Sequence, residues 1–315
     1  MKRSTHAFAI TALAASLAAC GGGGGSGSGS TGSVSFNMTD APTMEFSSVT
    51  IAFTGLRLKP ADGDWVDFTF DTPKTLDLLT LQGGVTEPLI TDEEVPAGNY
   101  TEARLMIDTS ASYVVVSGEP DVQKTLAVPS GEQSGLKLKG GFTVAADQST
   151  DFTIDFDARK SIVNPQGKSI GDYLLKPVLR LVSTDNTGSL SGQVDYATIS
   201  TTRMNDAGLA DCADPSTTGY YGAVYIYQGA DVEPTDLNIN SDTNPLVVAP
   251  VEDEDNDGIY TYSAAFLTAG DYTVSYTCQL DDNETTETGV EFDGTQNVTV
   301  NAGENTEAAP IPLVP

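Results

Sequence analysis

The stretch DFTIDFDA, Asp151–Ala158, decides the fold class of this 315-residue chain. Phe152, Ile154 and Phe156 fall on one face, and acidic residues with Thr153 fall on the other. Strict alternation of apolar and polar residues is typical of a half-buried β-strand, because successive side chains point to opposite faces. The stretch therefore predicts a sheet with one face against a core.

Similar runs, separated by Gly, Pro and Asp, fill the rest of the first half. In VTIAFTGLRLK, Val49–Lys59, every second residue at the start is apolar, and TLDLLTLQ, Thr75–Gln82, is the one possible helical turn. We predict an antiparallel β-sandwich or partly closed barrel over residues 34–186.

Residues 187–315 contain about seven short apolar runs, a number that suits an Ig-like or prealbumin-like sandwich. In YGAVYIYQG, Val224 and Ile226 oppose two tyrosines, and in YTVSYTC every second residue, ending at Cys278, should point inward. The predicted fold class is thus all-β, with two antiparallel β-sandwich domains.

The first thirty-three residues predict export and a membrane anchor. Residues 1–19 have a basic start and a short apolar stretch, which is typical of a secretory signal peptide. Leu17-Ala18-Ala19-Cys20 resembles the lipobox of bacterial lipoproteins, which implies that Cys20 is lipidated; an ordinary signal peptide that contains a cysteine is the alternative. Gly21–Ser33 then reads as a flexible Gly/Ser linker in the region 20–33. Gly21 after the cysteine resembles outer-membrane sorting, so we expect a cell-envelope protein on the periplasmic face or the cell surface.

Composition excludes several kinds of chemistry. The only histidine, His6, lies in the signal peptide, so the mature chain has neither a histidine-based catalytic triad nor a histidine zinc ligand. Cys212 and Cys278 remain after Cys20 and are expected to form a disulfide in an oxidising compartment, with two reduced buried cysteines as the alternative.

The charge of the chain is strongly negative and uneven. Without Lys2 and Arg3, 13 Lys and Arg stand against 44 Asp and Glu, a net charge of −31. Such a surface repels phosphate backbones, so no nucleic-acid partner is expected. Residues 187–315 carry a single cation, Arg203, against 22 acids, which predicts an acidic second domain.

Six segments of the first half resemble an uncharacterised domain of bacterial and archaeal lipoproteins. The resemblance covers residues 34–183 and implies a location and a fold style but no reaction. The second half more loosely resembles prealbumin-like and carboxypeptidase-regulatory-like sandwiches, which implies a spacer or a weak binding module. The segments that carry the first resemblance are MTDAP (38–42), DLLTLQGG (77–84), VPAGNYTEARLMID (95–108), VPSGEQSGLKL (128–138), DFDARKSIV (155–163) and YLLKPVLRLV (173–182).

Three possible sites in the chain have simpler explanations. Ser134 and Lys137 match the S-x-x-K nucleophile motif, but that motif needs a helix and further motifs that the chain lacks, so chance is favoured. Asp155 and Asp157 could serve a glycan hydrolase as paired carboxylates, although a solvated or ion-paired strand edge explains them as well. Trp65 and the Tyr-rich strand could stack on sugars, although core packing is the commoner role.

The stretch PVEDEDNDGIYTY, Pro250–Tyr262, resembles the first half of a calcium loop. Asp253, Asp255 and Asp257 would supply carboxylates, and Ile259 its carbonyl. An EF-hand is excluded because loop position 12 is Ala264. A β-hairpin calcium loop and a solvated acidic turn both remain open.

Taken together, the residues predict a lipid-anchored, non-enzymatic structural or binding module of the cell envelope. The expected partners are the membrane, through the anchor, and an unidentified protein or glycan. A carboxylate-dependent envelope glycan hydrolase and a calcium-dependent adhesin are the alternatives, and calcium is the one cofactor considered.

Overall fold

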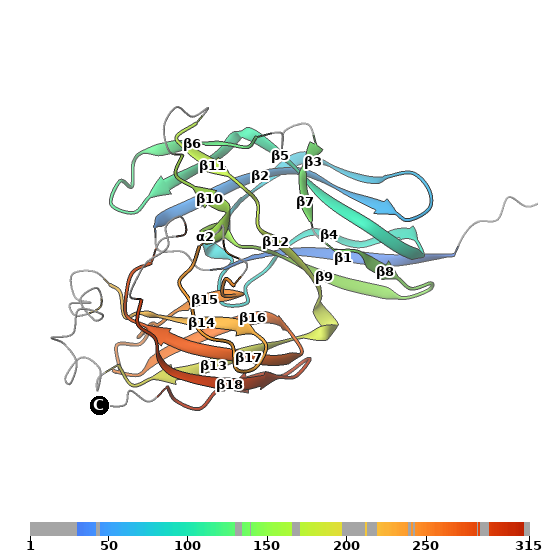
Figure 1. The fold of residues 1–315 in the computed structure, drawn as a ribbon. Helices are drawn as coiled ribbons and strands as arrows, with labels where there is room; N and C mark the ends of the chain where they lie inside the picture. The colour runs from blue at the N-terminus through green and yellow to red at the C-terminus, as the bar shows by residue number, and fades with distance from the viewer. Residues whose placement is uncertain are drawn as a thin grey trace, which may run out of the picture.

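Strands dominate the part of the chain that the structure describes. The computed structural model describes residues 30–41, 45–129, 134–138, 140–165, 171–196, 212, 219–238, 241, 243–281, 283 and 290–311. The bounded helical elements are short: α2 (Ala158–Ser161) and the 3₁₀ turns η1 (Leu78–Thr80) and η2 (Thr184–Asn186). The predicted all-β class is confirmed, and two sandwiches lie one above the other in Figure 1.

The N-terminal sandwich has a four-stranded sheet, the β1 sheet, in the order β12-β9-β1-β4. Its strands are β1 (Thr31–Asp40), β4 (Glu87–Pro96), β9 (Ser149–Phe156) and β12 (Leu179–Ser183).

The facing sheet, the β5 sheet, has the order β10-β11-β6-β5-β2-β3, with β7 and β8 also paired to β5. Its strands are β2 (Phe46–Pro60), β3 (Val66–Asp77), β5 (Gly98–Val116), β6 (Gln123–Ala127), β7 (Leu136–Leu138), β8 (Phe142–Val144), β10 (Ile162–Val163) and β11 (Tyr173–Leu175). The predicted helical turn in Thr75–Gln82 is the 3₁₀ turn η1, where the Asp77 side chain accepts the backbone N–H of Leu79.

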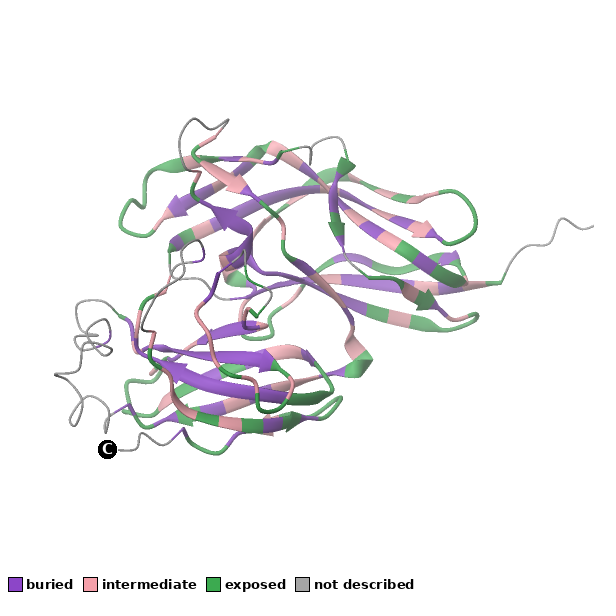
Figure 2. Ribbon diagram, viewed as in Figure 1, coloured by how far each residue is buried: buried purple, intermediate pink, exposed green. Residues whose placement is uncertain are grey.

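The alternating residues of the two sheets form the core between them. Phe36 of β1 stacks on Phe152 of β9 with ring centroids 5.0 Å apart, and Phe142 stacks on Tyr100 at 4.8 Å. The quoted stretch therefore faces the core as predicted. Its other face is not solvated, however: Thr153 and Asp155 are also buried. β9 is a central strand, and its end is covered from the other side, as Figure 2 shows by the purple of this region.

The C-terminal sandwich has seven strands among the described residues of 187–311, as the sequence predicts. One sheet, the β13 sheet, has the order β16-β13-β19, and the other, the β14 sheet, has the order β15-β14-β17-β18. The strands are β13 (Thr187–Val194), β14 (Ala223–Gln228), β15 (Val247–Pro250), β16 (Tyr260–Thr268), β17 (Gly270–Thr277), β18 (Asp293–Val300) and β19 (Asn305–Glu307).

Strand β14 is buried on both faces. Val224 and Ile226 belong to the main core of the C-terminal sandwich, whereas Tyr225 and Tyr227 pack with Leu237 in a second, smaller cluster. The two faces are therefore opposed as predicted, but neither faces water.

Three strand pairs run parallel, although the sequence predicts antiparallel sheets. They are β1 with β9, β6 with β11, and β13 with β19. A two-residue alternation predicts a strand but not the direction of its neighbour, which depends on the connection between the two strands. The remaining pairs are antiparallel.

The passage between the sandwiches is short. β12 runs through the single 3₁₀ turn η2 into β13, so no long linker separates the two folds. At the other end, β1 begins at Thr31, so the last three residues of the predicted Gly/Ser linker belong to a strand.

Candidate functional site

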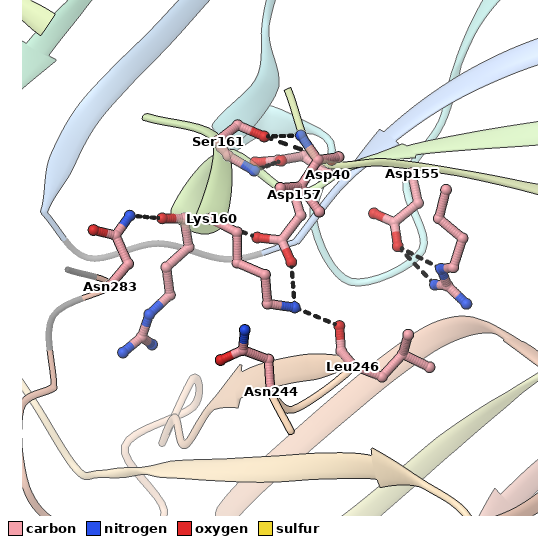
Figure 3. Close-up of polar contacts among 12 residues, drawn as sticks. Asp40, Asp155, Asp157, Lys160, Ser161, Asn244, Leu246 and Asn283 are labelled. Carbon is pink, nitrogen blue, oxygen red and sulfur yellow. Dashed lines mark hydrogen bonds and ion pairs between the residues drawn. The ribbon is translucent and has the colours of Figure 1, made fainter. Parts of the chain in front are cut away.

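The two sandwiches meet at a cluster of charged side chains, which we call the joint (Figure 3). The end of β1, the end of β9, helix α2 and β12 supply these side chains, and most come from the segments DFDARKSIV and YLLKPVLRLV. The charged residues of the joint on the N-terminal sandwich are Asp40, Asp155, Asp157, Arg159, Lys160 and Arg180.

Two carboxylates hold the first turn of α2. Asp157 is the N-cap, and its Oδ1 accepts the backbone N–H of Lys160 at 3.0 Å. Asp40 Oδ1, from the end of β1, accepts the N–H of Ala158 at 2.9 Å. The first N–H groups of a helix have no partner within the helix, so carboxylates are favourable here. This arrangement fixes α2 against the end of the β1 sheet.

Lys160 joins the two sandwiches through a buried ion pair. Its Nζ lies 2.7 Å from Asp157 Oδ2 and donates to the carbonyl of Leu246 in the C-terminal sandwich at 3.0 Å. The side chains of Lys160 and Asp157 are only 9% and 11% exposed. Removing one partner of such a pair leaves the other charge buried and uncompensated.

Arg180 makes the second connection. It lies directly opposite Asp155 in the β9–β12 register, and its Nη2 is 2.6 Å from Asp155 Oδ2. Its Nη1 donates to the carbonyl of Phe266 in β16 at 2.9 Å. Each of these two cations therefore has one carboxylate in its own sandwich and one carbonyl in the other.

Arg159 and Asn283 complete the joint. Arg159 lies over the ring of Tyr225 at 5.9 Å and donates to the carbonyl of Asp281 at 2.8 Å. Asn283 reaches back from the C-terminal sandwich and donates to the carbonyls of Ile162, at 3.0 Å, and Arg159. Polar contacts thus run in both directions across the joint.

Burial governs the protonation of the joint carboxylates. Burial raises the pKa of Asp40 well above its ordinary range, and the nearby charges of Asp157 and Asp155 raise it further. Burial also raises the pKa of Asp155, against the opposing effect of Arg180. Asp40 Oδ2 is buried and has no hydrogen-bond partner. Burial and the two neighbouring carboxylates thus both disfavour the charged form of Asp40.

The arrangement leaves little room for chemistry on a glycan. Asp155 and Asp157, the predicted carboxylate pair, are brought to one place, but each is held in an ion pair. The cavity beside Asp40 and Asp155 has a volume of about 20 Å³, close to that of one water molecule. A sugar ring does not fit there. Asp155 and Asp157 are ion-paired, as one of the alternative interpretations predicts, but they lie in and directly after a central strand and not at a solvated edge.

In the acidic turn, Asp253–Gly258, two of the carboxylates accept local backbone hydrogen bonds. Asp253 accepts the N–H groups of Asp257 and Gly258, at 3.0 and 3.2 Å, and Asp257 accepts the N–H of Ile259 at 2.8 Å. Asn256 and Gly258 have positive φ angles, of 55° and 82°, as a tight turn requires. Within the described ranges no three His, Cys, Asp or Glu side chains are grouped so that they could hold a metal ion. Calcium at Asp253, Asp255, Asp257 and Ile259 stays a prediction.

The other candidate residues lie apart from the joint. Trp65 is clasped between Arg57 and Arg104, whose guanidinium carbons are 4.9 and 5.1 Å from its ring centroid. Lys137 lies in strand β7 and is ion-paired with Glu102, so Ser134 and Lys137 do not share the helix that the S-x-x-K motif needs. The tyrosines of β14 are buried, as their interpretation as core residues predicts.

The cysteines fall into two groups. Cys212 and Cys278 form a disulfide, and both are buried, as the sequence predicts. Cys20 lies outside the described residues, as do residues 1–19, so the lipid anchor stays a prediction. Among the helices that are described, none has the length and apolar character needed to cross a membrane.

The joint is the site that the sequence did not reveal. The sequence indicates Asp155 and Asp157 only as a pair of carboxylates, and most partners of the joint residues lie far along the chain. Asp40 and Ala158 are 118 residues apart, and Arg159 and Asp281 are 122 apart. Such pairings leave no periodic signal in a single sequence.

Comparison with solved structures gives only remote likenesses. A leucine-rich repeat protein from Bacteroides thetaiotaomicron is 13% identical, with 90% of this chain and 26% of that chain covered and a TM-score of 0.22. The minor pilin of Streptococcus agalactiae is 10% identical, with 89% and 98% covered and a TM-score of 0.19. A fimbrial protein from Bacteroides ovatus is 11% identical, with 90% and 48% covered and a TM-score of 0.20. The chain spans about a quarter of the length of the first of these. At such scores the likenesses carry no argument about function.

Comparison with sequences is informative for the first half only. No curated protein matches the chain. The expected resemblance to an uncharacterised domain is confirmed, because residues 31–177 match the family model described as Domain of unknown function (DUF4382).

Proposed function

We propose that this chain is a non-enzymatic structural and binding module of the cell envelope, held at the membrane by a lipid on Cys20. One observation carries the proposal: the charged residues that offered the best case for catalysis are used to hold two sandwiches together. Asp157 and Asp155 are ion-paired with Lys160 and Arg180, and these two cations donate to carbonyls of the C-terminal sandwich. The two sandwiches therefore form one body at the end of the Gly/Ser stretch.

The body presents an acidic sandwich beyond the domain that follows the anchor. Its partner in this proposal is a protein or glycan of the envelope, reached over the surfaces of the sandwiches rather than in a deep pocket. The glycan hydrolase alternative finds no support at Asp155 and Asp157, because both are held in ion pairs and the cavity that Asp155 lines with Asp40 has room for about one water molecule.

Lipid attachment is tested by labelling. In a Gram-negative host fed with an alkyne fatty acid, the wild-type chain is expected to carry the label and to sediment with membranes. Cys20→Ser should lose both properties, whereas the control Gly21→Ala, which keeps the cysteine, should retain them. A labelled Cys20→Ser chain, or an unlabelled wild type, contradicts the anchor.

The absence of catalysis is tested on envelope glycans. Purified wild-type protein is expected to release no more sugar reducing ends than a heat-denatured sample of the same protein. A release that is present in the wild type and lost in Asp155→Asn contradicts the non-enzymatic proposal, whatever the labelling shows.

A further inference from the structure

Three short segments of the first half recur in the second half. TGSVS at 31–35 recurs as TGSLS at 187–191, and TVAADQST at 143–150 recurs as TVNAGENT at 299–306. Both recurrences have the same spacing, 156 residues, from 31 to 187 and from 143 to 299. AGNYT at 97–101 recurs as AGDYT at 269–273, with a spacing of 172. In chain order, TGSVS is the first segment, AGNYT the second and TVAADQST the third. The constant spacing of the first and third segments indicates that they occupy equivalent positions in two copies.

The backbone pairing follows the same correspondence. In each sandwich the first segment pairs antiparallel with the strand before the second segment, and parallel with the end of the third segment. The second segment in turn pairs with the start of the third. In the N-terminal sandwich these three pairings are Gly32↔Val95, Ser33↔Ser149 and Gly98↔Val144. In the C-terminal sandwich the corresponding pairings are, in the same order, Gly188↔Leu267, Ser189↔Asn305 and Gly270↔Val300.

Side chains make the same hydrogen bonds at the matched positions. Tyr100 donates to the carbonyl four residues before it at 2.8 Å, and Tyr272 does the same at 2.6 Å. Thr143 donates to Asn99 at 2.8 Å, and Thr299 donates to Asp271 at 2.7 Å. A tyrosine that bonds to the backbone a few residues upstream occurs in other β-sandwiches. The matched bonds of Thr143 and Thr299, together with the constant spacing, are therefore the observations that point to one unit used twice.

The first glycine of each copy is equally constrained. A Cβ atom on Gly32 would lie 2.3 Å from the carbonyl oxygen of Ala145, and one on Gly188 would lie 2.2 Å from that of Asn301. At the turn of the third segment, Asp147 and Gly303 have φ angles of 57° and 74°, and each donates its N–H to the first residue of the first segment. We call this region, built from the three segments, the framework corner.

We infer that the N-terminal and C-terminal sandwiches are two copies of one structural unit, and that the joint is a docking surface added to the first copy to receive the second. The spacing of 156 places Tyr196 in the second copy where Asp40 stands in the first. Asp40 therefore has no aspartate counterpart in the second copy, and none of Asp157, Arg159 and Lys160 lies in the three segments that build the framework corner. Their partner is a second copy of the same unit.

The joint chemistry agrees with this division. Arg159, Lys160 and Arg180 all reach carbonyls of the C-terminal sandwich, whereas the framework corner makes its bonds within each sandwich. The framework corner therefore specifies the fold of each copy, and the joint specifies how the copies meet. The inference does not depend on the lipid anchor.

An exchange of segments in the full mature chain tests the duplication. Residues 143–150 and 299–306 are swapped in register, so that each copy receives the turn of the other. We expect a folded protein whose melting temperature stays within about 5 °C of the wild type, because the framework corner is preserved. As a control, the same swap with the register moved by one residue should lose more than about 15 °C or fail to fold, because it displaces Val144, Val300 and the positive-φ residue. Equal losses in both chimeras overturn the inference.

A calorimetric measurement tests the docking surface. Wild-type protein is expected to unfold in one transition, and the double variant Arg159→Ala with Asn283→Ala in two, because each copy then unfolds by itself. The control is Arg57→Ala with Asp67→Ala, which removes an exposed ion pair outside both the joint and the framework corner and should keep a single transition. A single transition at lower temperature in the joint variant means that these residues stabilise the first sandwich itself, and it contradicts the docking role.

Discussion

The joint and the acidic turn are both rich in aspartate, but the negative charges are stabilised in different ways in the two regions. In the joint, Asp155 and Asp157 are buried, and each has a cation within 2.7 Å. In the turn, Asp255 and Asp257 are exposed, and the carboxylate bonds are to backbone N–H groups. Burial makes an unpaired charge costly, whereas water screens it. The same residue type therefore holds two sandwiches together in one place and shapes a turn in the other.

The largest effect is expected from breaking the buried pair. Asp157→Ala removes the partner of Lys160 and the N-cap of α2, and we expect it to lower the free energy of unfolding by about 3–5 kcal/mol. Urea unfolding measures the change. Asp151→Ala, at an exposed position of the preceding strand β9, is the control and should change the free energy of unfolding by less than about 0.5 kcal/mol. A similar small loss for both variants means that the pair is not buried in solution.

An intermediate effect, which depends on pH, is expected at Asp40. Burial raises the folded pKa of Asp40, so above the ordinary value of 3.8 the unfolded chain loses a proton that the folded chain keeps. This contribution to stability is complete below that value and is lost as pH rises towards the folded pKa. Asp40→Asn cannot ionise, so its stability relative to the wild type should improve steadily from pH 4 to pH 8 in chemical denaturation. A difference that is constant with pH contradicts a neutral Asp40.

The smallest effect is expected in the acidic turn. Without calcium, Asp255→Ala should change the free energy of unfolding by less than about 0.5 kcal/mol, since its side chain is exposed. The calcium prediction adds that millimolar calcium raises the melting temperature of the wild type and that Asp253→Asn with Asp257→Asn abolishes the rise. Magnesium at the same concentration is the control for ionic strength. A melting temperature that calcium leaves unchanged removes the calcium-dependent adhesin from consideration.

The sequence predicted those parts of the fold that depend on local pattern. The alternation of apolar and polar residues in DFTIDFDA and VTIAFTGLRLK predicted two strands and the faces that they turn to the core. The expectation of export to an oxidising compartment predicted the disulfide between Cys212 and Cys278. The sequence did not predict the parallel neighbours or the joint, because these depend on contacts between residues that lie far apart in the chain, such as Asp40 with Ala158 and Lys160 with Leu246. The sequence indicated Asp155 and Asp157 as possible catalytic carboxylates. Their structural role became clear only from their burial and their ion pairs. The duplication could have been predicted by aligning the two halves, since TGSVS and AGNYT recur almost unchanged.

The parallel pairing of the first strand with a late strand has a consequence for how the chain folds. Phe36 of β1 pairs with Phe152, and Leu190 of β13 pairs with Thr306, each 116 residues later. Neither sandwich can close its central strand until the ribosome has made nearly the whole of that unit. Contacts so distant in sequence slow folding to the range of milliseconds to seconds. We therefore expect each sandwich to remain incompletely folded during most of its synthesis, because β1 and β13 have no parallel partner until β9 and β19 have been made.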